Sequence, residues 1–392
     1  MPTNREEQCL KFNSMRRNLY IALIPIMLLL ACGEKPKSEK LSQTMVDGHA
    51  KRFSLVQKNG ITELYLFGIK NKPDTTSRFI LAKDTVGLAN THRGFTVIKT
   101  PVKKVAALGS VYANMLDVLG ALDCLVAVDN MQYIGNPRIC AKHQKSPMAE
   151  LALSPVLDFE KTWRLQPDIL FTFGMGEGEK DVDQKIKMSR LPNCVIVDHL
   201  ESNPLARAEW IKVVAVFLDK DSLANAIFDA TVERYNKLKA RAASDKNRPT
   251  VFTEARFGDV WYMPGGKSFM ACLIKDAGAQ YLWADDQSTG SIPLSFEQVY
   301  AKAKGADFWI NPSAFKNKDE MQQAENRYTS FAAFQNNTIY NNNLHLNQYG
   351  YSNYWESGLI FPDRIISDLI KIFHPALKIS SDSSFNYYKR LN

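Results

Sequence analysis

Short apolar runs alternate with helical patterns from Val102 onward, and this alternation constrains the fold more than any other feature of the chain. The runs at Val102 to Leu108, Leu125 to Val128, Ile169 to Phe173 and Val195 to Val197 are typical of buried strands. Amphipathic helices are predicted between them, for example at 112–119 and 157–165. Because parallel strands need a helical crossover, residues 101–204 predict an α/β lobe with a mainly parallel sheet.

The segment 205–246 contains no convincing strand pattern and separates the first set of elements from a second one. Apolar residues recur at helical spacing over 205–218 and again over 222–243, which predicts a long rigid helical link. A second alternation follows, with strands at 250–254, 308–311 and 338–340 and helices at 269–277, 296–303 and 358–373. Residues 247–378 therefore predict a second α/β lobe, and residues 379–392 are interpreted as a C-terminal tail.

A small β-rich module is predicted ahead of the first lobe, over residues 49–100. Extended runs at 52–57 and 61–69 flank Lys58-Asn59-Gly60, and an Asn-Gly pair between extended runs is a strong signal for a hairpin. Further short strands are expected at 78–82 and 94–98. We expect this leader module to pack on the first lobe.

The N-terminal 31 residues carry an export signal. Arg16 and Arg17 precede an apolar run that is too short to span a bilayer as a stable helix, although a plain membrane anchor is the alternative interpretation. Leu29-Leu30-Ala31-Cys32 resembles the bacterial lipobox, which predicts lipidation of Cys32 after removal of residues 1–31. Residues 32–48 are polar and are interpreted as a tether, and Met15 is an alternative start. The expected location is the periplasm, with a lipid anchor in a membrane.

Composition and charge exclude some classes of function. Of 392 residues, 45% are hydrophobic and 23% are charged, which is enough apolar material for large cores. The net charge is +8, yet no block of five or more basic residues occurs, so nucleic-acid binding is not expected. Cys124, Cys140, Cys194 and Cys272 could form one or two disulfides or remain as buried thiols, and the sequence does not decide between these.

Three segments carry a resemblance to a known family. "VAALGSVYANMLDVLG" (105–120), "LDFEKTWRLQPDIL" (157–170) and "LSFEQVYAKAKGADFWINPS" (294–313) are similar to segments of periplasmic substrate-binding proteins of the ABC importers for iron complexes and cobalamin. The resemblance covers residues 102–375. It implies a monomeric binding protein without enzymatic activity or cofactor, whose partners are a permease dimer with ATPase subunits and a transported metal chelate.

The predicted ligand site lies between the two lobes, because open α/β sheets bind ligands beyond the carboxyl ends of their strands. Aromatic side chains and an arginine at such positions suit a large, partly apolar, anionic metal chelate. Packing in the core is the alternative for each aromatic residue. The candidates are Ser110, Tyr112, Tyr133, Phe173, Met175 and His199 in the first lobe, and Arg256, Phe257, Trp261, Tyr262, Trp283, Asn311, Tyr349, Tyr351, Tyr354 and Trp355 in the second.

Glu160 and Glu297 each follow a phenylalanine near the start of a predicted helix, one in each lobe. The family resemblance implies that these two carboxylates dock on arginines of the permease. The alternative is a local role, because a carboxylate in the first turn also stabilises a helix.

Ferric siderophore, haem and cobalamin all fit the predicted site. A carrier of bare zinc or manganese is the alternative, with His143, His199 and His345 as ligands, although no HxH or HxxxH pair is present. A secreted enzyme is a remote alternative, because no Gly-x-Ser-x-Gly motif occurs and Gly174-Met175-Gly176-Glu177-Gly178 lacks the Lys-Ser/Thr of a phosphate loop.

Overall fold

The computed structural model describes residues 48–69, 75–153, 156–201, 203–379 and 381–392. The predicted signal peptide, the lipidation site at Cys32 and nearly all of the tether lie outside these residues. Within the described residues, no helix has both the length and the apolar character needed to cross a membrane.

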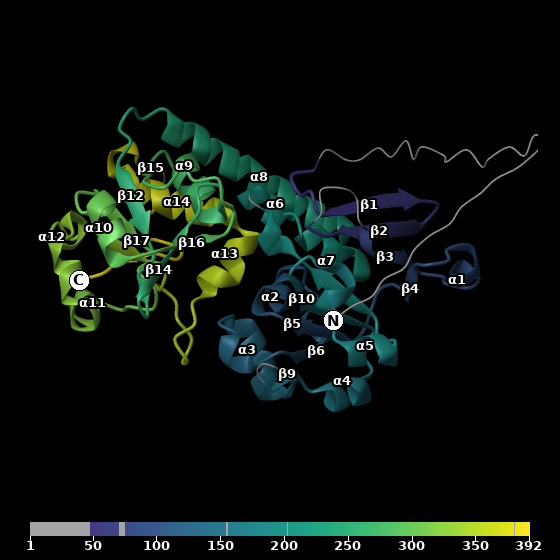
Figure 1. Cartoon of the computed structure of the whole chain (residues 1–392). Coiled ribbons are helices and arrows are strands. Elements are labelled where there is room, and N and C mark those ends of the chain that lie inside the picture. Colours follow the sequence, from purple (N-terminus) through teal and green to yellow (C-terminus); the bar gives the residue numbers. More distant parts are fainter. Residues whose placement is uncertain (1–47, 70–74, 154–155, 202, 380) are drawn as a thin grey trace, which may run out of the picture. The chain divides into compact units, whose positions relative to one another are not determined.

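The leader module forms a four-stranded sheet in the order β1-β2-β3-β4, as predicted (Figure 1). Asn59 and Gly60 both have positive φ, and the turn they make pairs Lys58 with Ile61. Apolar side chains of this sheet, including Leu64, Phe79 and Ile98, belong to the same hydrophobic core as the first lobe. Its elements are β1 (Phe53–Lys58), β2 (Ile61–Phe67), β3 (Thr75–Ala82), α1 (Leu88–Thr91) and β4 (Thr96–Lys99).

The first lobe contains a five-stranded sheet in the order β11-β10-β5-β6-β7, in which all neighbouring strands are parallel. The central strands are buried on both faces, which explains their continuous apolar sequences. The elements are β5 (Val105–Leu108), α2 (Ser110–Val118), β6 (Leu125–Val128), α3 (Pro137–Lys145), β7 (Ala149–Glu150), the short pair β8 (Ala152–Leu153) and β9 (Val156–Leu157), α4 (Phe159–Leu165), β10 (Ile169–Phe173), α5 (Gln184–Ser189) and β11 (Asn193–Ile196).

Three helices connect the lobes: α6 (Pro204–Ala208), α7 (Ile211–Phe217) and α8 (Asp221–Ala243). The long helix α8 takes part in two hydrophobic cores. Ala224 near its start lies in the first-lobe core, whereas Tyr235 and Ala242 lie in the second-lobe core. The predicted helical link is therefore present, with its first part divided into two short helices.

The second lobe has a five-stranded sheet, β15-β12-β17-β18-β19, and a three-stranded antiparallel sheet, β13-β14-β16 (Figure 1). The larger sheet is parallel except for β19. The elements are β12 (Thr250–Thr253), β13 (Arg256–Phe257), β14 (Val260–Pro264), α9 (Phe269–Asp276), β15 (Gln280–Tyr281), β16 (Ser291–Leu294), α10 (Phe296–Ala303), β17 (Phe308–Ile310), α11 (Lys318–Ala324), α12 (Ala332–Gln335), β18 (Ile339–Asn341), α13 (Ser357–Ile360), α14 (Pro362–Phe373) and β19 (Lys389–Arg390).

Strand β19 corrects the interpretation of residues 379–392 as a tail. Tyr387, Tyr388 and Leu391 are buried in the second-lobe core, and residues 389–390 pair with β18. The backbone N–H groups of Asn386 and Tyr387 donate to the buried carboxylate of Asp368 on α14. The end of the described chain is therefore an integral edge strand of the second lobe.

Candidate functional site: a cleft pocket at the strand ends of the first lobe

A cavity of about 430 Å³ lies at the carboxyl ends of the first-lobe strands, where an open parallel sheet is expected to bind a ligand. Four consecutive strand ends supply its floor. Gly109 to Tyr112 follow β5, Asp129 and Tyr133 follow β6, Phe173 ends β10, and Asp198 and His199 follow β11. We call this cavity the cleft pocket. Its remaining wall consists of Arg207 from α6 and of Tyr351, Ser352, Trp355 and Leu359 from the second lobe.

Seven of the predicted ligand residues line the cleft pocket: Ser110, Tyr112, Tyr133, Phe173, His199, Tyr351 and Trp355. Four of their rings form two pairs. Tyr133 and Tyr351 meet edge to face with ring centroids 4.9 Å apart, and Phe173 lies 4.5 Å from the imidazole of His199 at an angle of 32°. Phe173 and Trp355 are about half exposed, so flat apolar surface is available to a ligand.

The polar part of the cleft pocket was largely missed by the sequence reasoning. Nη2 of Arg207 lies 3.3 Å from Oδ2 of Asp198, and the guanidinium carbon is 4.8 Å from the centre of the Phe269 ring. Asp129 lines the pocket as well, and burial raises the pKa of its carboxyl group. Asp129 and Asp198 each directly follow a strand that the sequence does predict. That position was the signal that could have identified them.

The histidine of the cleft pocket carries little positive charge at neutral pH. Desolvation lowers the pKa of His199, and Arg207 acts in the same direction, whereas Asp198 opposes them. Neither ring nitrogen of His199 has a hydrogen-bond partner among the described residues.

Four predicted ligand residues of the second lobe are core or buried residues instead. Trp261 is fully buried, and its Nε1 donates a hydrogen bond of 3.0 Å to the carbonyl of Thr253. Trp283, Asn311 and Tyr354 are also buried, and the two aromatic residues among them belong to the second-lobe core. Within the described part of the chain, these four residues do not contribute to the lining of the cleft pocket. The alternative interpretation, packing in the core, is the one that fits them.

Arg256 is placed differently from the expectation that it faces an anionic ligand. Its guanidinium pairs with Glu325 and, at 2.9 Å, with Asp259, so its charge is already compensated within the second lobe. Hydrogen bonds from Arg327, together with the charge of Arg256, lower the pKa of Glu325 to about 2. Met175, Phe257, Tyr262 and Tyr349 are exposed, but they do not line the cleft pocket within the described part of the chain.

Residues 344–356 reach from the second lobe to the first, and we call them the cross-lobe segment. Nδ2 of Asn347 donates to the carbonyls of Gln132 and Ile134, at 2.7 and 3.0 Å. The backbone N–H of Gly135 donates to Oε1 of Glu356 at 2.6 Å. Glu356 is 2% exposed, and burial raises the pKa of its carboxyl group to about 7. These contacts hold the loop that carries Tyr133 against the segment that carries Tyr351 and Trp355.

Glu160 and Glu297 are both exposed, with side-chain exposures of 74% and 73%. Glu160 lies 2.5 Å from Arg164, and Glu297 lies 3.1 Å from Arg327. The caps of their helices come from other residues, since Asp158 caps α4 and Ser295 forms a capping box with Gln298 on α10. The two carboxylates are therefore accessible and are not needed as N-caps.

Metal-ligating side chains do not gather within the described residues, where no group of three or more histidine, cysteine or acidic residues has the geometry to hold an ion. Among the three histidines of the zinc or manganese alternative, His199 lines the cleft pocket, whereas Nδ1 of His143 accepts a hydrogen bond from the backbone of Met148. Cys124, Cys140, Cys194 and Cys272 are free thiols.

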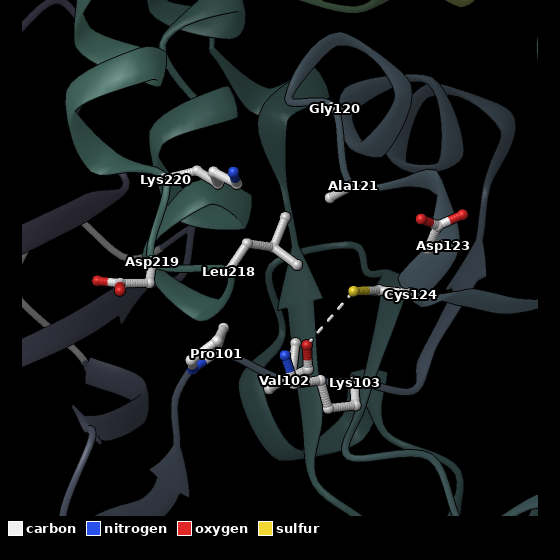
Figure 2. A pocket seen from close by; sticks show the side chains of 10 residues that line it. All are labelled: Pro101, Val102, Lys103, Gly120, Ala121, Asp123, Cys124, Leu218, Asp219 and Lys220. Carbon is white, nitrogen blue, oxygen red and sulfur yellow. Dashed lines mark hydrogen bonds between the residues drawn. The ribbon is translucent and has the colours of Figure 1, made fainter.

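A second cavity, of about 330 Å³, lies before strands β5 and β6, at the end of the sheet opposite the cleft pocket (Figure 2). Sγ of Cys124 donates to the carbonyl of Val102 at 3.5 Å, and Asp123 also lines this cavity (Figure 2). Burial raises the pKa of the Cys124 thiol, so this sulfur is not activated as a nucleophile. No predicted ligand residue lines this cavity within the described chain.

Comparison with known proteins agrees with the two-lobed architecture and its cleft. Residues 105–342 match the model of the family described as periplasmic binding protein. The chain belongs to this family. The match begins at β5 and ends just after β18, so it includes the first-lobe floor of the cleft pocket but neither the leader module nor the cross-lobe segment.

Individual relatives are distant. An uncharacterised lipoprotein of Methanocaldococcus jannaschii is 24% identical over 318 residues, which cover 79% of this chain and 72% of the relative. A periplasmic haem-binding protein from Pseudomonas aeruginosa superimposes with a TM-score of 0.56 at 14% identity, over 74% of this chain and 98% of that one. The vitamin B12 binding protein of Vibrio cholerae gives a TM-score of 0.52 at 13% identity, over 71% and 99%.

Family membership confirms three predictions from the sequence. The chain is a binding protein rather than an enzyme, its two lobes have the fold of solute-binding proteins, and the predicted family is the one that matches. The solved structures establish the fold of this periplasmic binding protein.

Proposed function

We propose that this periplasmic binding protein is a lipid-anchored carrier that captures a metal chelate and delivers it to an ABC importer of the inner membrane. The chelate is a ferric siderophore, haem or cobalamin. The cleft pocket carries the proposal, because it combines a concave site at the parallel strand ends with half-exposed aromatic faces from both lobes.

The similar structures support the same class of ligand. Those from Pseudomonas aeruginosa and Vibrio cholerae are named for binding haem and vitamin B12, which are metal complexes of a large, partly apolar macrocycle. Aromatic side chains at the rim, such as Phe173 and Trp355, provide surface on which such a ligand can stack. A pocket for a bare ion would need several convergent ligands instead.

Native mass spectrometry of the purified protein with ferrichrome, haemin and cyanocobalamin tests the ligand class. We expect a one-to-one complex with at least one of them. A Phe173→Ala, Trp355→Ala double variant should weaken that complex, whereas a Phe257→Ala, Tyr262→Ala variant should not, because these exposed rings lie outside the cleft pocket. Absence of a complex with all three chelates would contradict the proposal.

We propose that the protein docks on the importer through Glu160 and Glu297. Each carboxylate is exposed, lies on a different lobe and pairs with a surface arginine. Exposed ion pairs of this kind contribute little to stability, so exchanging Arg164 and Arg327 for arginines of a permease is energetically accessible. The charge of one glutamate on each lobe would orient the protein on a two-subunit permease.

Chelate uptake by cells that carry the Glu160→Ala, Glu297→Ala variant tests this assignment. Uptake should fall at least tenfold while chelate affinity stays within about twofold, because rim charges outside the pocket contribute little to binding. The matched control is Glu177→Ala with Glu233→Ala, which removes two other exposed glutamates with i,i+3 and i,i+4 partners. Normal uptake by the Glu160, Glu297 variant would reject the docking role.

A further inference from the structure

The cleft pocket contains more negative than positive charge. Two carboxylates, Asp129 and Asp198, line it together with one guanidinium, that of Arg207. His199 does not alter this balance, since burial disfavours its protonated form. Among the described lining residues, no lysine or second arginine is present.

The single guanidinium pairs through Nη2 with Asp198, while its Nε is buried without a hydrogen-bond partner among the described residues. Arg207 and Asp198 form an ion pair in which the side chains are only 13% and 5% exposed. The guanidinium also lies over the ring of Phe269 from the second lobe, at 4.8 Å. An anionic ligand would therefore have to compete with Asp198 for a buried partner, and separating a buried pair is costly.

Part of the Asp129 carboxylate is unused as well. Oδ1 is buried and has no hydrogen-bond partner among the described residues, although it lines the pocket directly after β6. An ionised carboxylate only accepts hydrogen bonds, so a ligand satisfies it with an N–H or O–H group and not with another carboxylate. An acidic group placed beside it would be repelled and desolvated at the same time.

We infer that Asp129 is a specificity-determining residue of the cleft pocket, which selects chelates that carry no net negative charge and that present a hydrogen-bond donor to this carboxylate. The inference rests on the proposed function. It replaces the expectation of an anionic chelate, which depended on Arg256 facing the ligand. Haem with two ionised propionates is disfavoured, whereas neutral chelates with amide or hydroxyl donors are favoured.

Pairs of probes in which an uncharged ester or amide replaces a carboxylate test the inference by titration calorimetry. The pairs are haemin with its dimethyl ester, and the monocarboxylic acid of cyanocobalamin with cyanocobalamin itself. At least one pair should bind. Within it, we expect the less negative probe to bind at least tenfold more tightly than the more negative probe. Asp129→Asn should reduce this ratio to about threefold or less by improving binding of the more negative member, and Asp129→Glu, which keeps the charge, should preserve the ratio.

Asp123→Asn is the control for the change in net charge. Asp123 precedes β6 and Asp129 follows it, so the two acids lie at opposite ends of one strand, and Asp123 lines the cavity of Figure 2 instead of the cleft pocket. The control should leave the ratio unchanged. The inference alone would be overturned if the wild type bound the more negative probe as tightly as the less negative one, or more tightly. It would also be overturned if Asp129→Asn left the ratio of the two affinities unchanged. Failure of all four probes and of ferrichrome to bind would overturn the proposed function as well.

Discussion

Glu356 should make the stability of the protein depend on pH in a direction opposite to that of most acidic residues. Desolvation raises its pKa from the ordinary value of 4.5 to about 7, despite the hydrogen bond from the backbone of Gly135. The folded protein therefore binds the proton more tightly than the unfolded chain. The stabilisation is complete below pH 4.5 and is lost as the pH rises to about 7.

The magnitude follows from the shift itself. A difference of one pKa unit corresponds to about 1.4 kcal/mol, so this carboxyl group should lower the free energy of unfolding by roughly 3 kcal/mol between pH 4.5 and pH 8. Burial also raises the pKa of Glu254 to about 7, which adds a slope of the same sign. The comparison of wild type with Glu356→Gln isolates the contribution of Glu356, because Glu254 is unchanged.

Urea denaturation at pH 5 and pH 8 provides the measurement. Glutamine keeps an oxygen that accepts from Gly135 but does not ionise, so Glu356→Gln should lose less stability than the wild type, by about 2 to 3 kcal/mol, as the pH rises. Glu160→Gln, at an exposed position, should behave as the wild type does. Equal pH dependence in wild type and Glu356→Gln would refute the argument that this carboxyl group is held in a desolvated site between the lobes.

Three further substitutions test the assignments of Trp261 to the core, of Arg256 to an ion pair within the second lobe, and of Cys32 to the lipid anchor. Trp261→Ala should lower the free energy of unfolding by about 3 to 5 kcal/mol in urea denaturation with unchanged chelate affinity of the folded protein, and a selective loss of affinity would contradict its place in the core. Arg256→Ala should leave chelate affinity unchanged while the pKa of Glu325, followed by NMR titration, rises from about 2. Cys32→Ala should abolish incorporation of labelled fatty acid, and continued labelling would exclude Cys32 as the lipidated residue.

The strand pattern could be predicted because both α/β sheets bury short apolar runs on both faces. Predicted and observed limits coincide for β6 and β10 and agree within a few residues for the other predicted strands, whereas the antiparallel sheet β13-β14-β16 and the two-residue strands β7 and β15 were not predicted. The edge strand β19 was missed, since Tyr387, Tyr388 and Leu391 lie in a polar context that has no strand periodicity. Pairing with β18 and the carboxylate of Asp368 order this segment, and both are contacts distant in sequence.

Most of the candidate ligand residues of the first lobe line the cleft pocket, whereas most of those of the second lobe do not, and this difference has a physical reason. In the first lobe each candidate follows a parallel strand, and strand ends converge on one edge of a sheet. In the second lobe the candidates were aromatic residues, and composition does not tell an aromatic ring in the core, such as Trp261, from one at a rim, such as Trp355. Arg256 was predicted to bind the ligand because it is charged. Its partner Glu325 is distant in sequence, so the ion pair could not be predicted.

Helix α8 belongs to both lobes at once, and this determines where the molecule can bend. Its 23 residues span about 35 Å, with Ala224 fixed in one core and Tyr235 and Ala242 in the other. Between these anchors lies a single stretch around Thr231, whose hydroxyl donates to the carbonyl of Ile227, a hydrogen bond that favours bending of a helix. Tilting of one lobe against the other should concentrate in that turn, because flexure at either end would open a packed core to water.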